Sequence, residues 1–264
     1  MISAKIIEDS VNPDGKRLTT FECTFNRWIL AELNTHRMLS RNSASSRAIP
    51  INKIISQVWK NPAYPVFWGK NQAGMQSKVE LKGFRLWFAK RLFFFARIPA
   101  IIFVWMLSKV KMHKQVSNRI LEPWMWHTAI VSSTEWSNFF KLRLHPDAQP
   151  EFQELARCMK VCFDKSIPTF VDWGNWHTPY VSDENEDGLT NAKISAACCA
   201  RVSYVRQNDR KSVDEDIKMS NRLIDNGHYS PLEHPAQAVK DFVGGNFAGG
   251  WKQLRKFYIG EDGK

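Results

Sequence analysis

The chain has 264 residues, of which 44% are hydrophobic, 12% aromatic and 24% charged. This composition is typical of a soluble globular protein, and it excludes a mainly disordered, collagen-like or low-complexity chain. At this length one large domain or two small ones can form. We predict a single domain over residues 1–264.

The formal net charge of +11 is concentrated in one part of the chain. Ten Lys or Arg residues lie between Ser77 and Arg119, against one acidic residue, Glu80. We therefore predict a basic, aromatic-rich helical segment at 77–118. An excess of positive charge favours anionic partners such as nucleotides, nucleic acid, acidic lipid or a polyanionic substrate.

The five cysteines predict neither a disulfide framework nor a zinc site. Their number is odd, no CxxC motif is present and no Cys–His spacing fits a zinc finger. We expect a reduced, cytoplasmic protein, and the charged segment 1–9 shows no signal peptide. The cysteines are Cys23, Cys158, Cys162, Cys198 and Cys199.

The first elements predicted are two strands at 2–7 and 18–25, joined as a hairpin by the turn signal at 12–15. Apolar residues at helical spacing then predict a helix that ends near Thr35. The small, polar segment 41–46 has no periodicity and predicts a loop.

A short helix at 54–59 and a loop at 61–74 are predicted next. Segment 84–107 is densely apolar with eight aromatic residues, but Lys, Arg and Pro99 interrupt it. We predict a buried or partner-facing helical hairpin there. A helix on a membrane surface and a true membrane span are the alternatives.

The second half of the chain is predicted to be mainly helical. Helices are expected within 119–140 after Pro123, and again from Pro150. Segment 169–187 is irregular and acidic toward its end, and a capping box at Ser212 begins a helix that stops at Gly227. The fold class predicted is α+β, helix-rich with a small antiparallel sheet.

Three polar clusters have the composition of functional sites. Segment 36–47 combines three Arg, one His and four Ser, which suits a phosphate or a planar acidic ring, although a solvated turn has a similar composition. Segment 227–235 holds two His and one Glu, with no third ligand at metal spacing. We expect a cofactor-contacting loop or a structural turn there and no metal. Segment 138–151 brings Asn138 and Arg143 to a junction between helices.

Together these clusters resemble the flavin-dependent thymidylate synthase family. One signature of the family matches His36-Arg37, Ser40, Asn42, Ser45 and Arg47. A second matches Ala200-Arg201-Val202-Ser203 and the run Gly227 through His234. A third matches Arg119, Pro123, Asn138, Arg143, Ala148, Gln149 and Glu151.

The order of the motifs differs from that of the family, where the second signature precedes the first. Here it follows by some 160 residues. The chain thus resembles a circularly permuted, divergent member of the family. A fold tolerates circular permutation when its original termini lie close together. Permutation predicts that the C-terminal quarter returns to the N-terminal helix.

The resemblance implies a set of FAD-binding residues: Thr35, His36, Arg37, Ser43, Asn138, Ser230 and Glu233. It implies a second set that contacts a pyrimidine deoxynucleotide monophosphate: Glu32, Ser45, Ser46, Arg47, Arg119 and Arg143. Arg143 is the implied catalytic residue, which would stabilise charge developing on the pyrimidine.

The implied reaction converts dUMP to dTMP, with methylenetetrahydrofolate as the carbon donor and NADPH as the reductant of FAD. The family forms homotetramers with sites shared between subunits, so some residues are expected to act in trans. No cysteine nucleophile is implied. Thr35, Ser43 and Ala48 depart from the family pattern, which leaves a pyrimidine nucleotide hydroxymethylase as the closest alternative.

A protein that binds single-stranded nucleic acid is the alternative of another class. The aromatic and basic segment 77–119 favours it, because stacking rings and cations suit single strands. Against it, apolar runs such as Phe93-Phe94-Phe95 are expected to form core. Segment 69–74 resembles a phosphate loop but lacks its G-K-[ST] ending.

Overall fold

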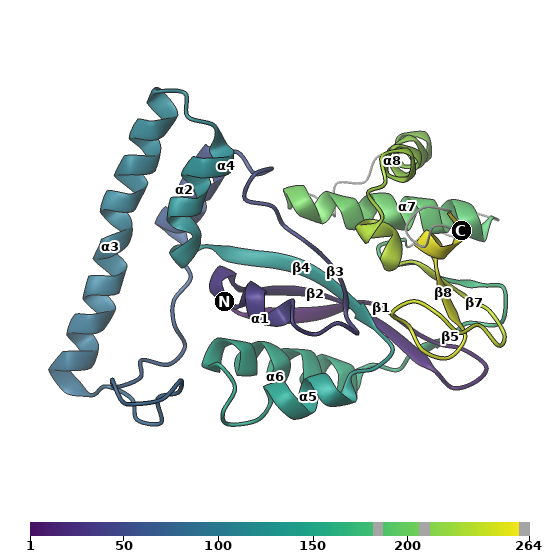
Figure 1. Ribbon diagram of the computed structural model, residues 1–264, viewed down its shortest axis with the longest axis horizontal. Helices are drawn as coiled ribbons and strands as arrows, with labels where there is room; N and C mark the ends of the chain where they lie inside the picture. The colour runs from purple at the N-terminus through teal and green to yellow at the C-terminus, as the bar shows by residue number, and fades with distance from the viewer. Residues whose placement is uncertain (182–186, 206–211, 259–264) are drawn as a thin grey trace.

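The computed structural model describes residues 1–181, 187–205 and 212–258. Two β-sheets with helices on both sides form the body, and one long helix stands at its end (Figure 1). The fold is α+β and rich in helix, as predicted. The acidic end of segment 169–187 lies largely outside the described residues.

The main sheet has five strands in the order β3-β4-β2-β1-β5. All neighbouring pairs are antiparallel except β1 and β5, a parallel pair that the sequence did not predict. The predicted hairpin is confirmed, because β1 and β2 are joined at Gly15, whose positive φ of 73° suits glycine. The strands are β1 (Ser3–Val11), β2 (Arg17–Asn26), β3 (Ser40–Ser43), β4 (Trp126–Ser133) and β5 (Thr169–Phe170).

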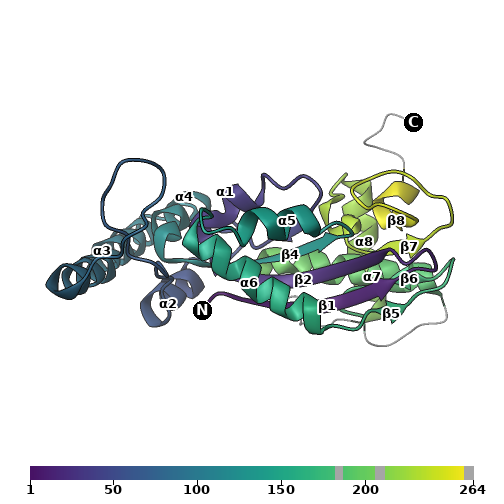
Figure 2. The ribbon, with the colours of Figure 1, turned by 90° about the horizontal axis from the view of Figure 1, so that it is seen from below.

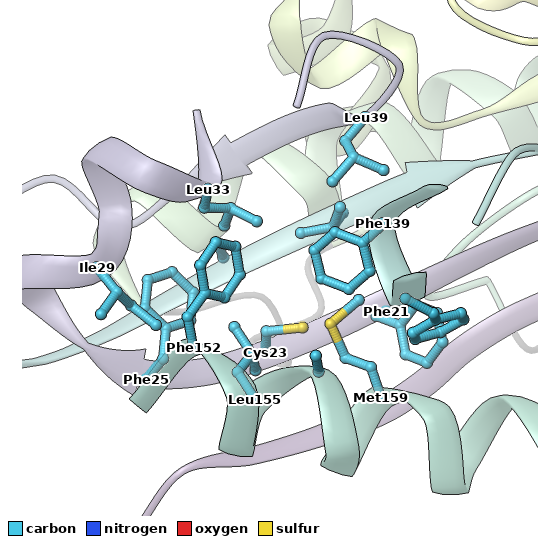
Figure 3. Packing of buried hydrophobic residues seen from close by; sticks show 14 of the residues in the cluster. Phe21, Cys23, Phe25, Ile29, Leu33, Leu39, Phe139, Phe152, Leu155 and Met159 are labelled. Atoms are coloured by element: carbon cyan, nitrogen blue, oxygen red, sulfur yellow. The ribbon is translucent and has the colours of Figure 1, made fainter. Parts of the chain in front are cut away.

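One face of this sheet carries the main hydrophobic core (Figure 3). Alternate residues of β2 point to the same face, so Phe21, Cys23 and Phe25 are all fully buried there. They pack against α5 (Ser137–Arg143) and α6 (Pro150–Lys165), which covers β1 and β2 (Figure 2). The helix predicted from Pro150 is therefore confirmed.

The opposite face is covered by the C-terminal part of the chain (Figure 1). Helix α7 (Gly188–Arg201) packs there, and α8 (Val213–Asp225) packs on α7. Ser212 caps α8 as the predicted capping box requires, since Ser212 Oγ accepts a hydrogen bond of 3.3 Å from the Glu215 amide. A second sheet holds β6 (Trp176–His177), β7 (Ala236–Ala238) and β8 (Trp251–Gln253), all antiparallel.

Short helical turns connect these elements. After β2 come a 3-10 turn (Arg27–Ile29) and α1 (Leu30–Leu33), close to the predicted helix. Helix α2 spans Ile51–Lys60 and includes the predicted segment 54–59. The remaining helices are α4 (Lys114–Ser117) and 3-10 turns at Asn118–Trp124, Val202–Tyr204, Ser230–Glu233 and Leu254–Phe257.

The predicted helix within 119–140 is wrong in its central part. Residues 126–133 form β4, which pairs with both β2 and β3 and is buried over most of its length. A strand covered on both faces is apolar at successive positions, so its sequence does not show the alternation of a half-buried strand. Pro123, taken as a helix start, instead lies inside a 3-10 turn that ends before the strand.

The predicted loop at 41–46 is also partly wrong, because Ser40–Ser43 form β3. This strand lies at the edge of the sheet and pairs only with β4. Its residues are polar because their side chains bind other polar groups instead of entering a core. Hydrophobic periodicity therefore could not reveal it.

The predicted helical hairpin at 84–107 is a single helix, α3 (Gly83–Lys109), which continues through Pro99. By length and composition alone α3 could cross a membrane. Its most apolar 18-residue window has a mean hydropathy of 1.7, and 17% of that window is buried. One side of α3 packs on α2 through Val104, whereas Phe84, Trp87 and Phe95 are more than half exposed.

We predict that Phe21→Ala lowers the free energy of unfolding by about 3–5 kcal/mol, because it leaves a cavity between β2 and the helices. Phe21 is fully buried and meets Trp136 edge to face at 5.0 Å. Urea unfolding monitored by circular dichroism measures the change. Ile167→Ala is the control, since Ile167 is 91% exposed and its loss should cost less than about 0.5 kcal/mol. Equal losses in the two variants would contradict the packing described.

Candidate functional site

The C-terminal quarter of the chain contacts strand β3. Gln253 Nε2 donates to Ser40 Oγ at 2.9 Å, and Ser230 Oγ donates to the Arg41 carbonyl at 2.9 Å. Ser230 and Arg41 are 189 positions apart in the sequence. The C-terminal quarter, predicted to return to the N-terminal helix, thus contacts the strand that follows this helix. The circular permutation stays a prediction.

The end of helix α7 is held against the same segment. Asn42 Nδ2 donates to the Cys199 carbonyl at 2.6 Å, and the Ser45 amide donates to the Ser203 carbonyl at 3.0 Å. The predicted motifs at 36–47 and 200–203 therefore lie side by side.

A cleft of about 840 Å³ lies between these segments and α8. Its volume is in the range of small-molecule and cofactor sites. The motif at 36–47, the end of α7, helix α8 and the turn that follows α8 all contribute to it. The lining residues are Asn42, Ser45, Arg47, Ala48, Ala200, Ser203, Tyr204, Met219, Arg222, Leu223, Asn226, Gly227, His228, Tyr229, Ser230 and Pro231.

The cleft carries positive charge that the described residues do not neutralise. Arg47 and Arg222 both line it, and neither forms an ion pair with another residue in the described part of the chain. Hydroxyl and amide groups of Ser45 and Asn42 lie on the same lining. Guanidinium groups beside neutral hydrogen-bonding groups suit a phosphate-bearing ligand.

A second polar cluster forms where α1 meets the end of α5. Arg143 Nε donates to His36 Nε2 at 2.7 Å, and the other two guanidinium nitrogens lie 3.3 Å from Glu32 Oε2 and Thr35 Oγ1. The guanidinium carbon lies 4.4 Å from the centre of the Phe152 ring. Four of the predicted site residues, Glu32, Thr35, His36 and Arg143, thus converge in one place.

His36 is held in its neutral form. Burial, followed by the charges of Arg143 and Arg41, lowers its pKa from 6.5 to about 4. Because Nε2 accepts from Arg143, the ring proton of the neutral imidazole lies on Nδ1. His36 can therefore hold the Arg143 guanidinium in place without adding a charge of its own.

Arg41 connects this cluster with the C-terminal motif. Its guanidinium donates to the carbonyls of His36 at 2.6 Å and Leu33 at 3.1 Å, while its own carbonyl accepts from Ser230. Glu233, another predicted site residue, interacts electrostatically with Arg41 and forms an ion pair with Arg255. The sequence pattern contained Arg41 but did not give it this connecting position.

His234, at the end of the same motif, belongs to the protein interior. Its Nδ1 lies 2.8 Å from Ser132 Oγ on β4, and burial lowers its pKa to about 3. Ser132 continues the network through Thr20 at 2.6 Å to His177 at 2.8 Å. This half of the motif therefore joins the C-terminal segment to the sheet. Within residues 1–181, 187–205 and 212–258, no group of three His, Cys, Asp or Glu residues is arranged to hold a metal ion.

Four predicted substrate residues are absent from the cleft lining: Glu32 and Arg143, which belong to the cluster with His36, and Ser46 and Arg119. Ser46 is 8% exposed, and its hydroxyl donates to Glu122 Oε1 at 3.3 Å. Arg119 lies 3.9 Å from the same carboxylate and is more than half exposed. In one chain they form a separate group around Glu122.

The remaining predicted residues occupy different surfaces. Arg37 and Asn138 are exposed, on the turn after α1 and on α5 respectively. Ser43 ends β3 opposite Ala129 and is half-buried. None of the three lines the cleft.

Sequence reasoning missed several residues of the cleft, among them Arg222, Asn226 and Tyr204. Arg222 and Asn226 are one helical turn apart at the end of α8, directly before the predicted motif at Gly227. Their spacing could have placed both on the face next to that motif. Tyr204 carried no comparable signal.

No family model matches the sequence, and no curated protein matches it. Among solved structures, the chain is similar to flavin-dependent thymidylate synthase ThyX from Helicobacter pylori complexed with FAD and dUMP. The identity is 17%, the match covers 55% of this chain and 67% of that one, and the TM-score is 0.38.

The chain is also similar to the UMP/dUMP methylase PolB from Streptomyces cacaoi bound with 5-Br dUMP. Here the identity is 13%, the match covers 62% of this chain and 91% of that one, and the TM-score is 0.48. Because identities and TM-scores are this low, the function has to be argued from the residues of this chain.

We predict that His36 makes the fold less stable in acid. Its pKa is lowered from 6.5 to about 4 on folding, so the unfolded chain binds more protons between these values. The stability from neutral His36 is fully present above pH 6.5 and is lost as the pH falls through about 4. In urea unfolding, His36→Gln should therefore lose less stability than the wild type between about pH 7 and pH 4.5.

The comparison isolates His36, because His127, His177 and His234, whose pKa values are lowered to about 3, are present in both proteins. The same pH dependence in wild type and variant would show that His36 is not held neutral by the fold.

Proposed function

We propose that this protein is a flavin-dependent enzyme that transfers one carbon to C5 of a pyrimidine deoxynucleotide monophosphate. The specific reaction proposed is conversion of dUMP to dTMP with methylenetetrahydrofolate and NADPH. One observation carries the proposal. Two segments that carry separate family signatures meet at strand β3, where Ser230 binds the backbone carbonyl of Arg41, 189 positions away.

The donor set near the cleft fits an anionic nucleotide and a dinucleotide cofactor. Arg47 and Arg222 are available for phosphate groups, and Ser45 and Asn42 offer neutral donors and acceptors. His36 and Ser230, both in contact with Arg41, are the residues proposed to hold FAD. FAD, when bound, would supply the hydride chemistry, while the protein binds and orients the reactants.

Arg143 is proposed to contact the pyrimidine. His36 and Phe152 hold its guanidinium in one orientation, which avoids an ordering cost when substrate binds. Its contacts to Glu32 and Thr35 are both 3.3 Å, at the long end for hydrogen bonds, so a carbonyl oxygen of the base can replace them. A fixed cation there stabilises negative charge on the ring.

The homotetramer remains part of the proposal. Arg37, Asn138 and Arg119 match family positions but lie on exposed surfaces of the single chain. Sites shared between subunits would place these residues in the cleft of a neighbouring copy. Sedimentation velocity of the purified protein tests the assembly directly.

Incubation of the purified protein with dUMP, methylenetetrahydrofolate and NADPH tests the function. We expect a product whose mass corresponds to addition of one methyl group, and a purified protein with flavin absorbance. A hydroxymethyl product would support the alternative activity, for which Thr35, Ser43 and Ala48 are the relevant departures. The proposal fails if the protein retains no flavin and leaves both dUMP and dCMP unchanged.

We predict that Arg143→Ala lowers kcat by about 10²–10³ while FAD stays bound, because its proposed role is in charge stabilisation on the base. Lys141→Ala is the matched control, an exposed cation on the same helix. Steady-state kinetics measure the effect and absorbance after gel filtration measures flavin. If kcat of Arg143→Ala stays within a few-fold of the wild-type value, Arg143 has no catalytic role.

One observation keeps the nucleic-acid alternative open as a second candidate. Phe95, in a run expected to form core, is about half exposed. Phe84 and Trp87 are also exposed, on the same helix α3 as the exposed Arg85 and Arg91. Exposed rings and cations suit single strands. Oligonucleotide binding that weakens steeply with salt, and is lost in Trp87→Ala, would favour this function.

A further inference from the structure

Helix α3 has an apolar face that the rest of the described chain leaves open. The helix lies at one end of the molecule, with α2 and α4 on its inner side (Figure 1 and Figure 2). Five large apolar residues recur along its outer side at spacings of four and seven positions, and each is 47–72% exposed. These spacings place them on one side of a helix. This outer face consists of Phe84, Phe88, Phe95, Ile102 and Met106.

The inner side of α3 is apolar too, but protein covers it. Val104 is fully buried against α2, and Arg97 on the same side is 4% exposed. The Arg97 guanidinium donates to the carbonyls of Val58 at 2.6 Å and Trp59 at 2.7 Å, at the end of α2. A helix that is apolar on all sides is normally surrounded by a protein core or by lipid. Because protein covers only the inner side, we expect the outer face to meet a second apolar environment.

The charges of α3 are arranged in a way that suits a lipid bilayer. Between residues 92 and 108 the sole charged residue is the inward-facing Arg97, so about 25 Å of the outer side carries no charge. Exposed cations lie before and after this stretch, and the sequence 81–118 contains no acidic residue. Such cations bind anionic headgroups while apolar side chains enter the edge of the hydrocarbon. The cations are Lys82, Arg85, Lys90 and Arg91 before the stretch and Lys109 and Lys111 after it.

Two tryptophans, one near each end of α3, fit the same surroundings. Trp87 and Trp105 are both more than half exposed, and five full helical turns separate them, so they lie on one flank of the outer face. The Arg91 guanidinium carbon lies 5.7 Å from the centre of the Trp87 ring, and Lys109 Nζ lies 5.1 Å from that of Trp105. Indole rings concentrate at the level of the lipid headgroups, where their cation neighbours also meet negative charge.

The same face of a second copy is a poorer partner. A twofold contact would bring α3 against α3, and the exposed charges of both helices are positive. Like charges in contact oppose association. Single-stranded nucleic acid would meet the cations at the ends, but the stretch between them offers it no cation, and Ile102 and Met106 have no ring on which a base can stack.

We propose that the outer face of α3 binds the surface of an anionic lipid bilayer, with the helix lying in the plane of the interface. The five apolar side chains enter the edge of the hydrocarbon, and the flanking cations contact anionic headgroups. The inner side stays packed on α2, so the helix does not cross the bilayer. This surface is independent of the proposed one-carbon transfer, and its test requires neither flavin nor nucleotide.

Co-sedimentation of the full-length protein with preformed vesicles tests the proposal. One set of vesicles is phosphatidylcholine with about 30% phosphatidylserine, and the other is phosphatidylcholine alone. We expect the partition coefficient to be at least about tenfold higher for the anionic vesicles and to fall as salt is added. Equal partition onto the two sets, or no binding to either, would overturn the proposal.

The double variant Phe95→Ser/Ile102→Ser tests the apolar contribution. We expect partition onto the anionic vesicles to fall at least about tenfold, because two side chains no longer enter the hydrocarbon. Ile167→Ser/Val243→Ser is the matched control, since both residues are 91% exposed and lie outside α3. The control should bind as the wild type does. An equal effect in the two double variants would place the binding elsewhere and refute the surface.

The cations are tested by Arg85→Gln/Arg91→Gln. We expect partition onto the anionic vesicles to fall about tenfold and its dependence on salt to become weaker. Lys141→Gln/Lys165→Gln removes the same charge from exposed positions on α5 and α6 and should have little effect. If both variants lose binding equally, net charge and not α3 determines it, which contradicts the proposal.

Three further results would assign the outer face to another partner and overturn the proposal. In sedimentation velocity without lipid, a smaller assembly for Phe95→Ser/Ile102→Ser, together with absence of vesicle binding by the wild type, would make the face a subunit interface. Binding of oligothymidine but not of vesicles would make it a nucleic-acid surface. Protein that stays with the vesicles in alkaline carbonate would make α3 a membrane span. Melting curves check that each variant is folded; should one fail to fold, the two vesicle sets and the other variant decide.

Discussion

The candidate site depends on how the edge strand β3 is held. β4 pairs with its backbone on one side only, so its polar side chains and outward carbonyls need partners from elsewhere. The C-terminal quarter provides them, through Gln253 to Ser40 and Ser230 to Arg41. Arg41 connects this closure with the His36 cluster, because its guanidinium donates to the His36 carbonyl while its own carbonyl accepts from Ser230 of the cleft lining.

The guanidinium groups of Arg143, which is partly buried, and Arg97, which is buried, have different electrostatic surroundings. Arg143 lies beside the neutral His36 and the Glu32 carboxylate, so its charge is partly balanced, and His36 and Phe152 orient its guanidinium. Arg97 has aromatic rings and backbone carbonyls around it but no carboxylate among the described residues. Arg97 ties α3 to the C-terminal end of α2, where the last carbonyl oxygens carry partial negative charge.

Local sequence signals predicted the elements that begin or end at a turn or capping residue. The hairpin turn at Gly15, the start of α6 at Pro150 and the cap at Ser212 are all in place. Strand β4 was missed because burial on both faces removes alternation, and β3 because its stability comes from partners distant in sequence. For the site, the family resemblance implied Glu32, Thr35, His36 and Arg143 as site residues, and these four converge. Arg119 and Asn138, implied in the same way, lie apart from them in one chain. Spacing along a sequence carries no information about which copy completes a site.

The contact between β3 and the chain's last quarter has a consequence during protein synthesis. A nascent polypeptide leaves the ribosome from its N-terminus, so Ser40 and Arg41 emerge long before Ser230 and Gln253. Until translation reaches those residues the sheet can form its hairpin, but the polar edge stays open to wrong partners. Non-local contacts of this kind also slow folding. A truncation that removes Ser230 and Gln253 should therefore disturb strand β3, although β3 itself remains in the chain.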